Sequence, residues 1–216
     1  MGHRIILLGI QGSGKGTQAQ RLSGLLHVPH VSTGQLLWEA MSSQTVLGQQ
    51  ISAKMDSGTL VSDTEIDDLL RERLSQADCQ NGWLLDGYPR RLTQAITLSQ
   101  SFPPTMALHL QLGEDSARQR LFTRLICPQG HAYNSVYRPP RVDDLCDDDG
   151  LPLKRRSDET PEGIDRRFQM FREETLPVVR YYQEQRILHD VDASQSVGAV
   201  TRAILRHIAV TQTETT

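Results

Sequence analysis

The feature that most constrains the fold is a glycine-rich segment, Gly9 to Thr17, directly behind the apolar run Arg4 to Leu8. We call this segment the glycine loop. Its glycines let the backbone wrap closely around phosphate groups with the N–H groups pointing inward. A helix that begins here adds its positive N-terminal end, and Lys15 adds a mobile cation. The segment therefore predicts a polyphosphate site at the end of the first strand.

Short β-like runs alternate with helical patterns along the whole chain. This alternation favours a mainly parallel sheet that helices cover on both faces. A chain of 216 residues is long enough for one large core with an inserted subdomain. We therefore expect a three-layer α/β fold with a five-stranded parallel sheet. The expected strands are Ile5 to Leu8, a short run ending at Val31, Trp83 to Leu85, Met106 to Leu110, and Ile187 to Val191.

Composition limits the partners and the compartment. A formal net charge of -3 gives no general attraction to nucleic acid or to an anionic membrane, so the expected partners are small molecules. No apolar run approaches membrane-spanning length. The three cysteines cannot all be paired and no apolar leader precedes the first strand, which favours the cytoplasm. We expect the protein to be a monomer.

Residues 126 to about 159 break the helical pattern with prolines, glycines and clustered acidic residues. A structureless loop of this length is uncommon in a compact domain, so we expect a small inserted subdomain. Thr160 and Pro161 then predict a new helix, in which Thr160 caps the N-terminus and Pro161 occupies the first turn. Pro177 should kink or end that helix near Thr175. Earlier in the chain, Ser62 to Glu65 form a capping-box sequence.

Several motifs follow the glycine loop in order. They are Ser32-Thr33-Gly34, then Asp86-Gly87-Tyr88-Pro89-Arg90 with Gln94 behind it, then pairs of arginines in the second half of the chain. In the loop itself, the hydroxyl that usually follows the lysine comes one residue later, at Thr17. The loop variant and the order of the motifs resemble the adenylate kinase family in its long-lid form, and the resemblance covers nearly the whole chain.

The resemblance implies reversible transfer of the γ-phosphoryl group of Mg²⁺·ATP to AMP or a related nucleoside monophosphate. It also implies a P-loop kinase fold in which a core of residues 1–32, 63–123 and 161–216 carries an acceptor-binding insertion at 33–62 and a lid at 124–160. Phosphoryl transfer needs positioning, exclusion of water and positive charge around the moving group. A second class stays open, a nucleotide-binding regulatory protein with weak or no kinase activity.

By the resemblance, the two nucleotides occupy neighbouring sites, between which arginines grip the phosphate oxygens. The ATP site would be Gly12, Ser13, Gly14, Lys15, Gly16, Thr17, Arg120 and Arg124. The acceptor site would be Thr33, Leu60, Val61, Gly87, Arg90, Gln94, Arg156 and Arg167, with Gln94 and the Gly87 backbone reading adenine. The catalytic charges would be Lys15, Arg90, Arg124, Arg156 and Arg167, and Asp86 would orient the waters on Mg²⁺.

Four positions depart from the family pattern, of which Gln11, where the family often has proline, and Thr59, where it often has lysine, are the milder changes. After Ser-Thr-Gly the family has an aspartate and, three residues later, an arginine, whereas this chain has Gln35 and Trp38. That arginine resembles a principal clamp on the acceptor phosphate, and its loss should cost roughly a hundredfold in affinity. Trp38 is then a contact for a different acceptor, the mark of a decayed site, or a buried helix residue that packs against the core.

The inserted subdomain has candidate metal ligands near both of its ends: Cys127 and His131 at one, Cys146 and Asp149 at the other. Zinc bound by such paired ligands stabilises small modules that lack a core. In the zinc-bearing branch of the family, the second ligand stands where this chain has Gly130, so His131 comes one residue late. We expect either a structural tetrahedral zinc site or two buried free cysteines in a polar network.

Overall fold

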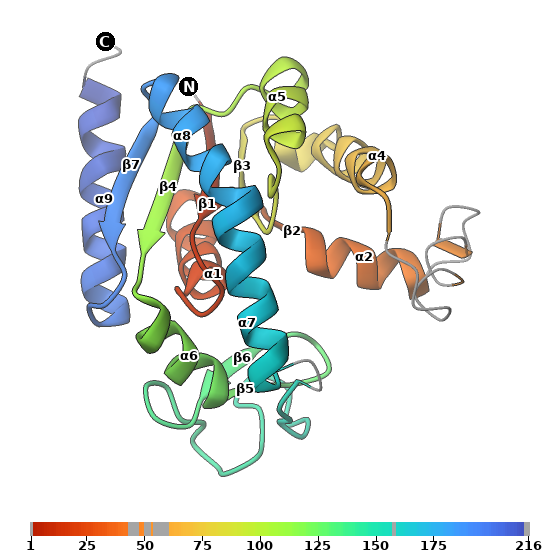
Figure 1. The fold of residues 1–216 in the computed structure, drawn as a ribbon, viewed down its shortest axis with the longest axis vertical. Helices are drawn as coiled ribbons and strands as arrows, with labels where there is room; N and C mark the ends of the chain where they lie inside the picture. The colour runs from red at the N-terminus through yellow and green to blue at the C-terminus, as the bar shows by residue number, and fades with distance from the viewer. Residues whose placement is uncertain (1, 43–47, 50–52, 54–60, 157–158, 214–216) are drawn as a thin grey trace.

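The computed structural model describes residues 2–42, 48–49, 53, 61–156 and 159–213. At its centre, five parallel strands form one sheet in the order β2-β3-β1-β4-β7 (Figure 1). The strands are β1 (His3–Leu8), β2 (His30–Ser32), β3 (Gly82–Asp86), β4 (Met106–Gln111) and β7 (Leu188–Asp192). The expected five-stranded parallel sheet is confirmed.

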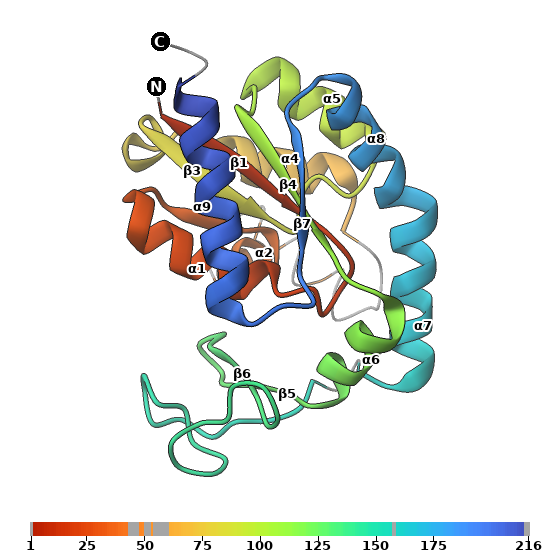
Figure 2. The same ribbon diagram turned by 90° about the vertical axis from the view of Figure 1, so that its left-hand side faces the viewer.

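Helices cover both faces of the sheet (Figures 1 and 2), so the expected three-layer arrangement is confirmed as well. β1 lies in the middle of the sheet, and its successive side chains point to opposite faces. Ile5 and Leu7 belong to the core cluster on one face, and Ile6 and Leu8 to the cluster on the other face. The helices are α1 (Lys15–Leu26), α2 (Thr33–Ser42), α4 (Asp63–Leu74), α5 (Leu92–Ser101), α6 (Glu114–Phe122), α7 (Pro161–Met170), α8 (Leu176–Glu184) and α9 (Val197–Thr213), with a short 3₁₀ turn at Ala77–Cys79. No helix in these described ranges is both long enough and apolar enough to cross a bilayer.

Two helix starts follow the predicted capping sequences. The Ser62 hydroxyl accepts the N–H of Glu65 at 3.4 Å, and the Glu65 carboxylate accepts the N–H of Ser62 at 2.9 Å, so α4 begins with a complete capping box. The Thr160 hydroxyl accepts the N–H of Gly163 at 3.1 Å, directly before Pro161 at the start of α7. Both predicted helix starts are confirmed.

Between α7 and α8 the chain forms a π-helical segment, Phe171–Thr175. Pro177 has no N–H to donate, and its ring crowds the carbonyl group four residues earlier. The wider π turn removes that conflict, so α7 and α8 follow one another without a sharp break (Figure 1). Regular α-helix does end before Thr175, as predicted, but the chain continues through the π-helical segment into α8 without the kink that was the other expectation. Segments of this kind are frequent at functional sites.

Beyond α6, at one end of the molecule, lies a small antiparallel pair of strands, β5 (Arg124–Ile126) and β6 (Ala132–Asn134) (Figure 2). This part of the chain has a buried cluster of its own, formed by Cys127, Tyr133, Cys146 and Leu153. It is connected to the rest of the fold through α6 on one side and α7 on the other.

Candidate active site

The glycine loop joins β1 to α1 and fits tightly against the structure behind it. Gly9 and Gly12 have φ angles of +143° and +87°, which L side chains rarely adopt. A Cβ atom on Gly12 would lie 2.7 Å from the carbonyl oxygen of Ala117 in α6, and one on Gly9 would lie 2.6 Å from that of Leu110 in β4. Only glycine satisfies both conditions, so these two positions fix the course of the loop.

Lys15 is the first residue of α1, and its side chain curls back over the loop. Its Nζ donates to the carbonyl oxygens of Gly9 at 2.7 Å and Ile10 at 3.0 Å. Burial lowers the pKa of Lys15 to about 8, although the Asp86 carboxylate favours the charged form. A desolvated ammonium of this kind is a strong site for an anion.

Ser13 gives a second indication of an anion at the loop. The residue is 2% exposed, and its Oγ has no hydrogen-bond partner among the residues that the structure describes. A buried hydroxyl without a partner is costly, and native structures rarely tolerate one unless a ligand satisfies it. A phosphate oxygen held by the loop would do so.

Electrostatic repulsion links Lys15 with four arginines from different parts of the chain, and we call these five residues, Lys15, Arg90, Arg124, Arg156 and Arg167, the cation cluster. Burial is the main reason why the pKa of Arg167, on α7, falls to about 10. Three neighbouring guanidinium groups, those of Arg156, Arg124 and Arg90, repel its charge and lower that pKa further. Arg90 and Arg124 lower the pKa of Lys15 in the same way. Such mutual repulsion destabilises the cluster unless a polyanion lies within it.

Arg124 has a special position at the start of β5. It forms an ion pair with Glu159, whose side chain is only 3% exposed, just before α7. The pair therefore joins the two ends of the segment that carries β5 and β6. Arg120, one turn earlier in α6, lies with its guanidinium carbon 5.6 Å from the ring centre of Tyr137 in that segment.

A second group of residues gathers where β2 and β3 end, because the carboxyl ends of parallel strands share one edge of the sheet. Thr33 begins α2, and its Oγ1 lies 2.6 Å from where a Cβ atom on Gly87 would stand. The Nε of Arg90 donates to the carbonyl oxygen of Gly87 at 2.8 Å. Asp86 ends β3, and its Oδ2 lies 3.4 Å from a Cβ position on Gly16. Asp86 therefore connects this group to the glycine loop.

Gln94 is buried in α5, and its amide is fully oriented by neighbours. Its Oε1 accepts the backbone N–H groups of Arg90 at 2.8 Å and Arg91 at 3.3 Å, and its Nε2 donates to Asp63 at 2.9 Å. Neither Asp63 nor Arg91 belongs to the sequence motifs of the predicted site. The hydrogen bond between Gln94 and Asp63 joins residues that are 31 apart in the sequence, so no periodic pattern indicates it.

Four positions in or near the expected acceptor site are less defined or differ from the family pattern. Leu60 lies outside the described residues, and Val61 is half-buried. Trp38 is 61% exposed on α2, so the interpretation that it packs in the core is wrong. Gln35 donates to Glu39 at 2.9 Å on the same helix.

Comparisons with known proteins agree with this geometry. A family model described as adenylate kinase matches residues 7–187. The chain is 39% identical over 209 residues to an adenylate kinase of Moorella thermoacetica, across 94% of this chain and 96% of the relative. It is 38% identical over 215 residues to an adenylate kinase of Methanocella arvoryzae, across 95% of this chain and all 100% of that relative. The chain belongs to the adenylate kinase family.

Membership of the adenylate kinase family makes the protein a phosphotransferase of the nucleoside monophosphate kinase class. The enzyme interpretation is thereby confirmed, and the alternative of a purely regulatory nucleotide-binding protein has no support. The five-stranded sheet and the glycine loop agree with the P-loop kinase fold of the family.

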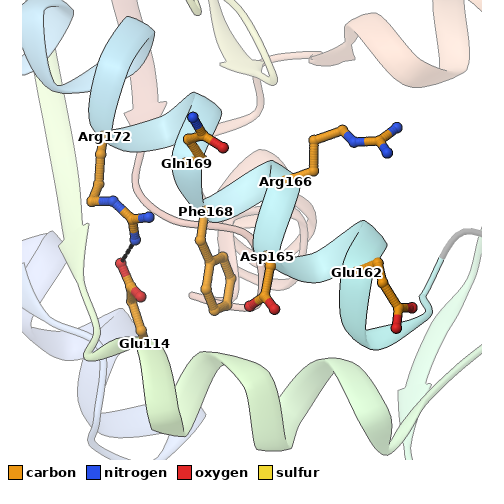
Figure 3. A pocket seen from close by; sticks show the side chains of 7 residues that line it. All are labelled: Glu114, Glu162, Asp165, Arg166, Phe168, Gln169 and Arg172. Atoms are coloured by element: carbon orange, nitrogen blue, oxygen red, sulfur yellow. Dashed lines mark hydrogen bonds and ion pairs between the residues drawn. The ribbon is translucent and has the colours of Figure 1, made fainter.

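A groove of about 430 Å³ on this adenylate kinase family member lies between α6 and α7 (Figure 3). Glu114, Glu162 and Asp165 line it, and Glu114 forms an ion pair with Arg172. Arg166 borders this groove, whereas the next residue, Arg167, belongs to the cation cluster. Three carboxylates against two arginines, Arg166 and Arg172, leave the lining with a net negative charge, which is unfavourable for phosphate, so we do not assign a nucleotide to this groove.

The segment with β5 and β6 brings the predicted metal ligands together. Ligand atoms of Cys127, His131, Cys146 and Asp149 all lie within 4.8 Å of one another. The Nδ1 of His131 is 3.3 Å from the sulfur of Cys127, 3.4 Å from that of Cys146 and 3.0 Å from Oδ2 of Asp149. The one-residue offset of His131 in the sequence therefore does not keep it from the other three.

Proposed function

We propose that this protein transfers the γ-phosphoryl group of Mg²⁺·ATP reversibly to AMP. The observation that carries the proposal is the cation cluster beside a loop whose buried Ser13 hydroxyl has no partner among the described residues. Phosphoryl transfer asks the protein for positioning and positive charge rather than covalent chemistry. The relatives named above carry the name of this activity.

On the donor side, the N–H groups from Gly12 to Thr17 bind the polyphosphate at the start of α1. Lys15 leaves its two carbonyl partners and contacts the β- and γ-phosphates, whose charge restores its full protonation. Arg120 lies against the adenine of ATP beside Tyr137. Arg124 exchanges the carboxylate of Glu159 for the transferred group.

On the acceptor side, Arg90 holds the phosphate of AMP, and Arg156 and Arg167 bind the oxygens that pass between the two nucleotides. Gln94 and the backbone of Gly87 read the adenine, and Thr33, Leu60 and Val61 complete that pocket. When bound, Mg²⁺ supplies charge neutralisation between the phosphates. Asp86, at the end of β3 and with its carboxylate close to Gly16, would orient the water ligands of that ion.

The same proposal covers domain organisation. The core of residues 1–32, 63–123 and 161–216 would stay fixed, while the insertion at 33–62 and the lid at 124–160 close over the nucleotides and exclude water. One chain supplies every residue named here, so we propose a monomer as the working unit. The three cysteines are unpaired, which fits the reducing cytoplasm.

The test is phosphoryl transfer from ATP to a panel of nucleoside monophosphates, followed as nucleoside diphosphate formed. We expect ADP from AMP, dependent on Mg²⁺, with the highest kcat/KM of the panel. Binding of ATP measured by calorimetry serves as the control for a folded donor site. ATP binding without turnover on any acceptor would contradict the proposal.

We also propose that Cys127, His131, Cys146 and Asp149 form a structural tetrahedral zinc site. Zinc takes thiolate, imidazole and carboxylate ligands at about 2.0 to 2.3 Å, and ligand atoms 3.0 to 3.4 Å apart can surround such an ion. The alternative is a metal-free polar network of the same side chains, since Cys127 is also 3.3 Å from Asp149.

Purified protein is expected to contain about one equivalent of zinc by elemental analysis. The Asp149→Ala and Cys127→Ser variants should lose the metal, and chelation should lower the Tm because zinc binding contributes to folding of such segments. Cys79→Ser is the matched control, since Cys79 lies in the core far from these ligands in the fold. Less than about a tenth of an equivalent in wild-type protein would rule out the zinc site.

A further inference from the structure

We infer that Arg91 is a positioning residue for recognition of the acceptor base. It holds Asp63, and Asp63 orients the amide of Gln94 so that an N–H, not a carbonyl oxygen, is left for the base. The inference rests on the proposed function, because there Gln94 reads adenine. It adds a residue that neither the sequence motifs nor the family resemblance assigned.

The Gln94 amide has one defined orientation. Its Oε1 already accepts two backbone N–H groups, from Arg90 and Arg91, which fills both lone pairs. Its Nε2 has two hydrogens, and one goes to Oδ1 of Asp63. Among the bonds made with described residues, this leaves one N–H of Gln94 available to a ligand.

Two side chains fix the carboxylate of Asp63. Its Oδ1 accepts from Gln94, and its Oδ2 accepts from Nη1 of Arg91 at 2.9 Å. Asp63 is the first residue of α4, so its backbone position is fixed by the capping box at Ser62. Without Arg91, the carboxylate could rotate toward solvent, since its side chain is 36% exposed, and Gln94 would lose the partner that orients it.

Arg91 is in turn bound by the π-helical segment between α7 and α8. The Nε of Arg91 lies 2.9 Å from Oε2 of Glu174, and the hydroxyl of Thr175 donates to the carbonyl oxygen of Arg90 at 3.1 Å. Two consecutive residues of the π segment therefore contact the two residues before α5. This links the base-reading amide to the helix that carries Arg167, a member of the cation cluster.

The chemical consequence is selectivity among purines. The N1 atom of adenine accepts a hydrogen bond, whereas the N1 atom of hypoxanthine or guanine carries a hydrogen. A fixed amide N–H can donate to N1 of adenine but has no acceptor at N1 of hypoxanthine or guanine. A site built in this way rejects the mismatched base. Arg91 thus acts on base choice through Asp63 and Gln94 without contacting the base.

The network itself contributes little stability, which separates positioning from a purely structural role. The side chains of Arg91, Asp63 and Glu174 are 45%, 36% and 34% exposed. Ion pairs this exposed contribute at most modestly to stability. The effect of Arg91 is therefore expected in the KM for the acceptor rather than in the melting temperature.

The test compares Arg91→Ala with wild-type enzyme, with kcat and KM measured for AMP, IMP and ATP. We expect the KM for AMP to rise about threefold to tenfold, which corresponds to the net free energy of one hydrogen bond. The KM for ATP should not change. The preference for AMP over IMP in kcat/KM should fall by a similar factor. Glu174→Gln, a milder change in the same network, should move both quantities in the same direction.

Arg172→Ala is the matched control, because it removes another exposed ion pair of the π segment, to Glu114, that does not reach Asp63. It should leave the AMP parameters unchanged. Equal AMP parameters in Arg91→Ala and wild type, or equal rises for AMP and ATP, would overturn the positioning role. Wild-type enzyme that forms no ADP from AMP would overturn the proposed function itself, and this inference with it.

Discussion

Lys15→Met is expected to lower kcat by about a hundredfold to a thousandfold, the usual cost of removing a group that stabilises charge in the transition state. Methionine keeps the length and apolar character of the side chain, so the variant removes the ammonium and little else. In the proposed mechanism that ammonium moves from the carbonyl oxygens of Gly9 and Ile10 to the β- and γ-phosphates. The measurement is steady-state phosphoryl transfer from ATP to AMP.

Thermal unfolding separates this effect from misfolding. The pKa of Lys15 in the folded protein is about 8, below its ordinary value of 10.5, so the charged form destabilises the fold near neutral pH. Lys15→Met should therefore unfold at the same or a higher temperature than wild type at pH 7. Lys154→Met, which changes an exposed lysine, is the control with normal activity. Full activity of Lys15→Met would contradict the role of Lys15 in the donor site.

Trp38→Arg is expected to lower the KM for AMP by about tenfold to a hundredfold, through a new charge-assisted bond to the acceptor phosphate. Position 38 lies about 7.5 Å along α2 from Thr33, which contacts the Gly87 end of the acceptor site. The indole is 61% exposed, so its replacement should cost little stability. The KM for ATP should not change.

Two further variants identify the reason for any change. Trp38→Gln removes the indole without adding charge, and Trp38→Lys adds a point charge without the bidentate fork of arginine. If the missing clamp is the whole explanation, affinity for AMP should improve in the order Gln, Lys, Arg. A rise in the KM for AMP in all three variants would instead show that Trp38 itself contacts the acceptor.

Most of the fold was predictable because its signals are local. The five strands of the central sheet overlap the short β-like runs in the sequence, whereas β5 and β6 were not predicted. The helix starts at Ser62 and Thr160 follow capping sequences whose partners lie three residues away. Pro177 predicted a change in the helix near Thr175, but not that the change would be a π-helical segment beginning at Phe171. The burial of Trp38 was open in the sequence, because a large aromatic residue on a helix is compatible with either face, and the structure places it in solvent.

The candidate sites depended on the tertiary structure to different degrees. Four cysteine, histidine and aspartate side chains are candidate zinc ligands from spacing alone, but only the folded chain brings His131 to 3.0 Å from Asp149 despite its offset. The pKa of Arg167 is lowered mainly by burial and further by Arg156, Arg124 and Arg90, which come from other parts of the chain. Such long-range repulsion leaves no mark in a local pattern.

The sequence by itself determined the phosphate-binding loop, because glycine spacing, the preceding strand and Lys15 are consecutive in the chain and act within one turn of backbone. Only the tertiary structure decided how Gln94, the proposed reader of the acceptor base, is held. Arg91 meets Asp63 across 28 residues and Glu174 across 83. Contacts at that separation are set by how α4, α5 and the π segment pack together, and that packing depends on the whole core rather than on any one stretch of sequence.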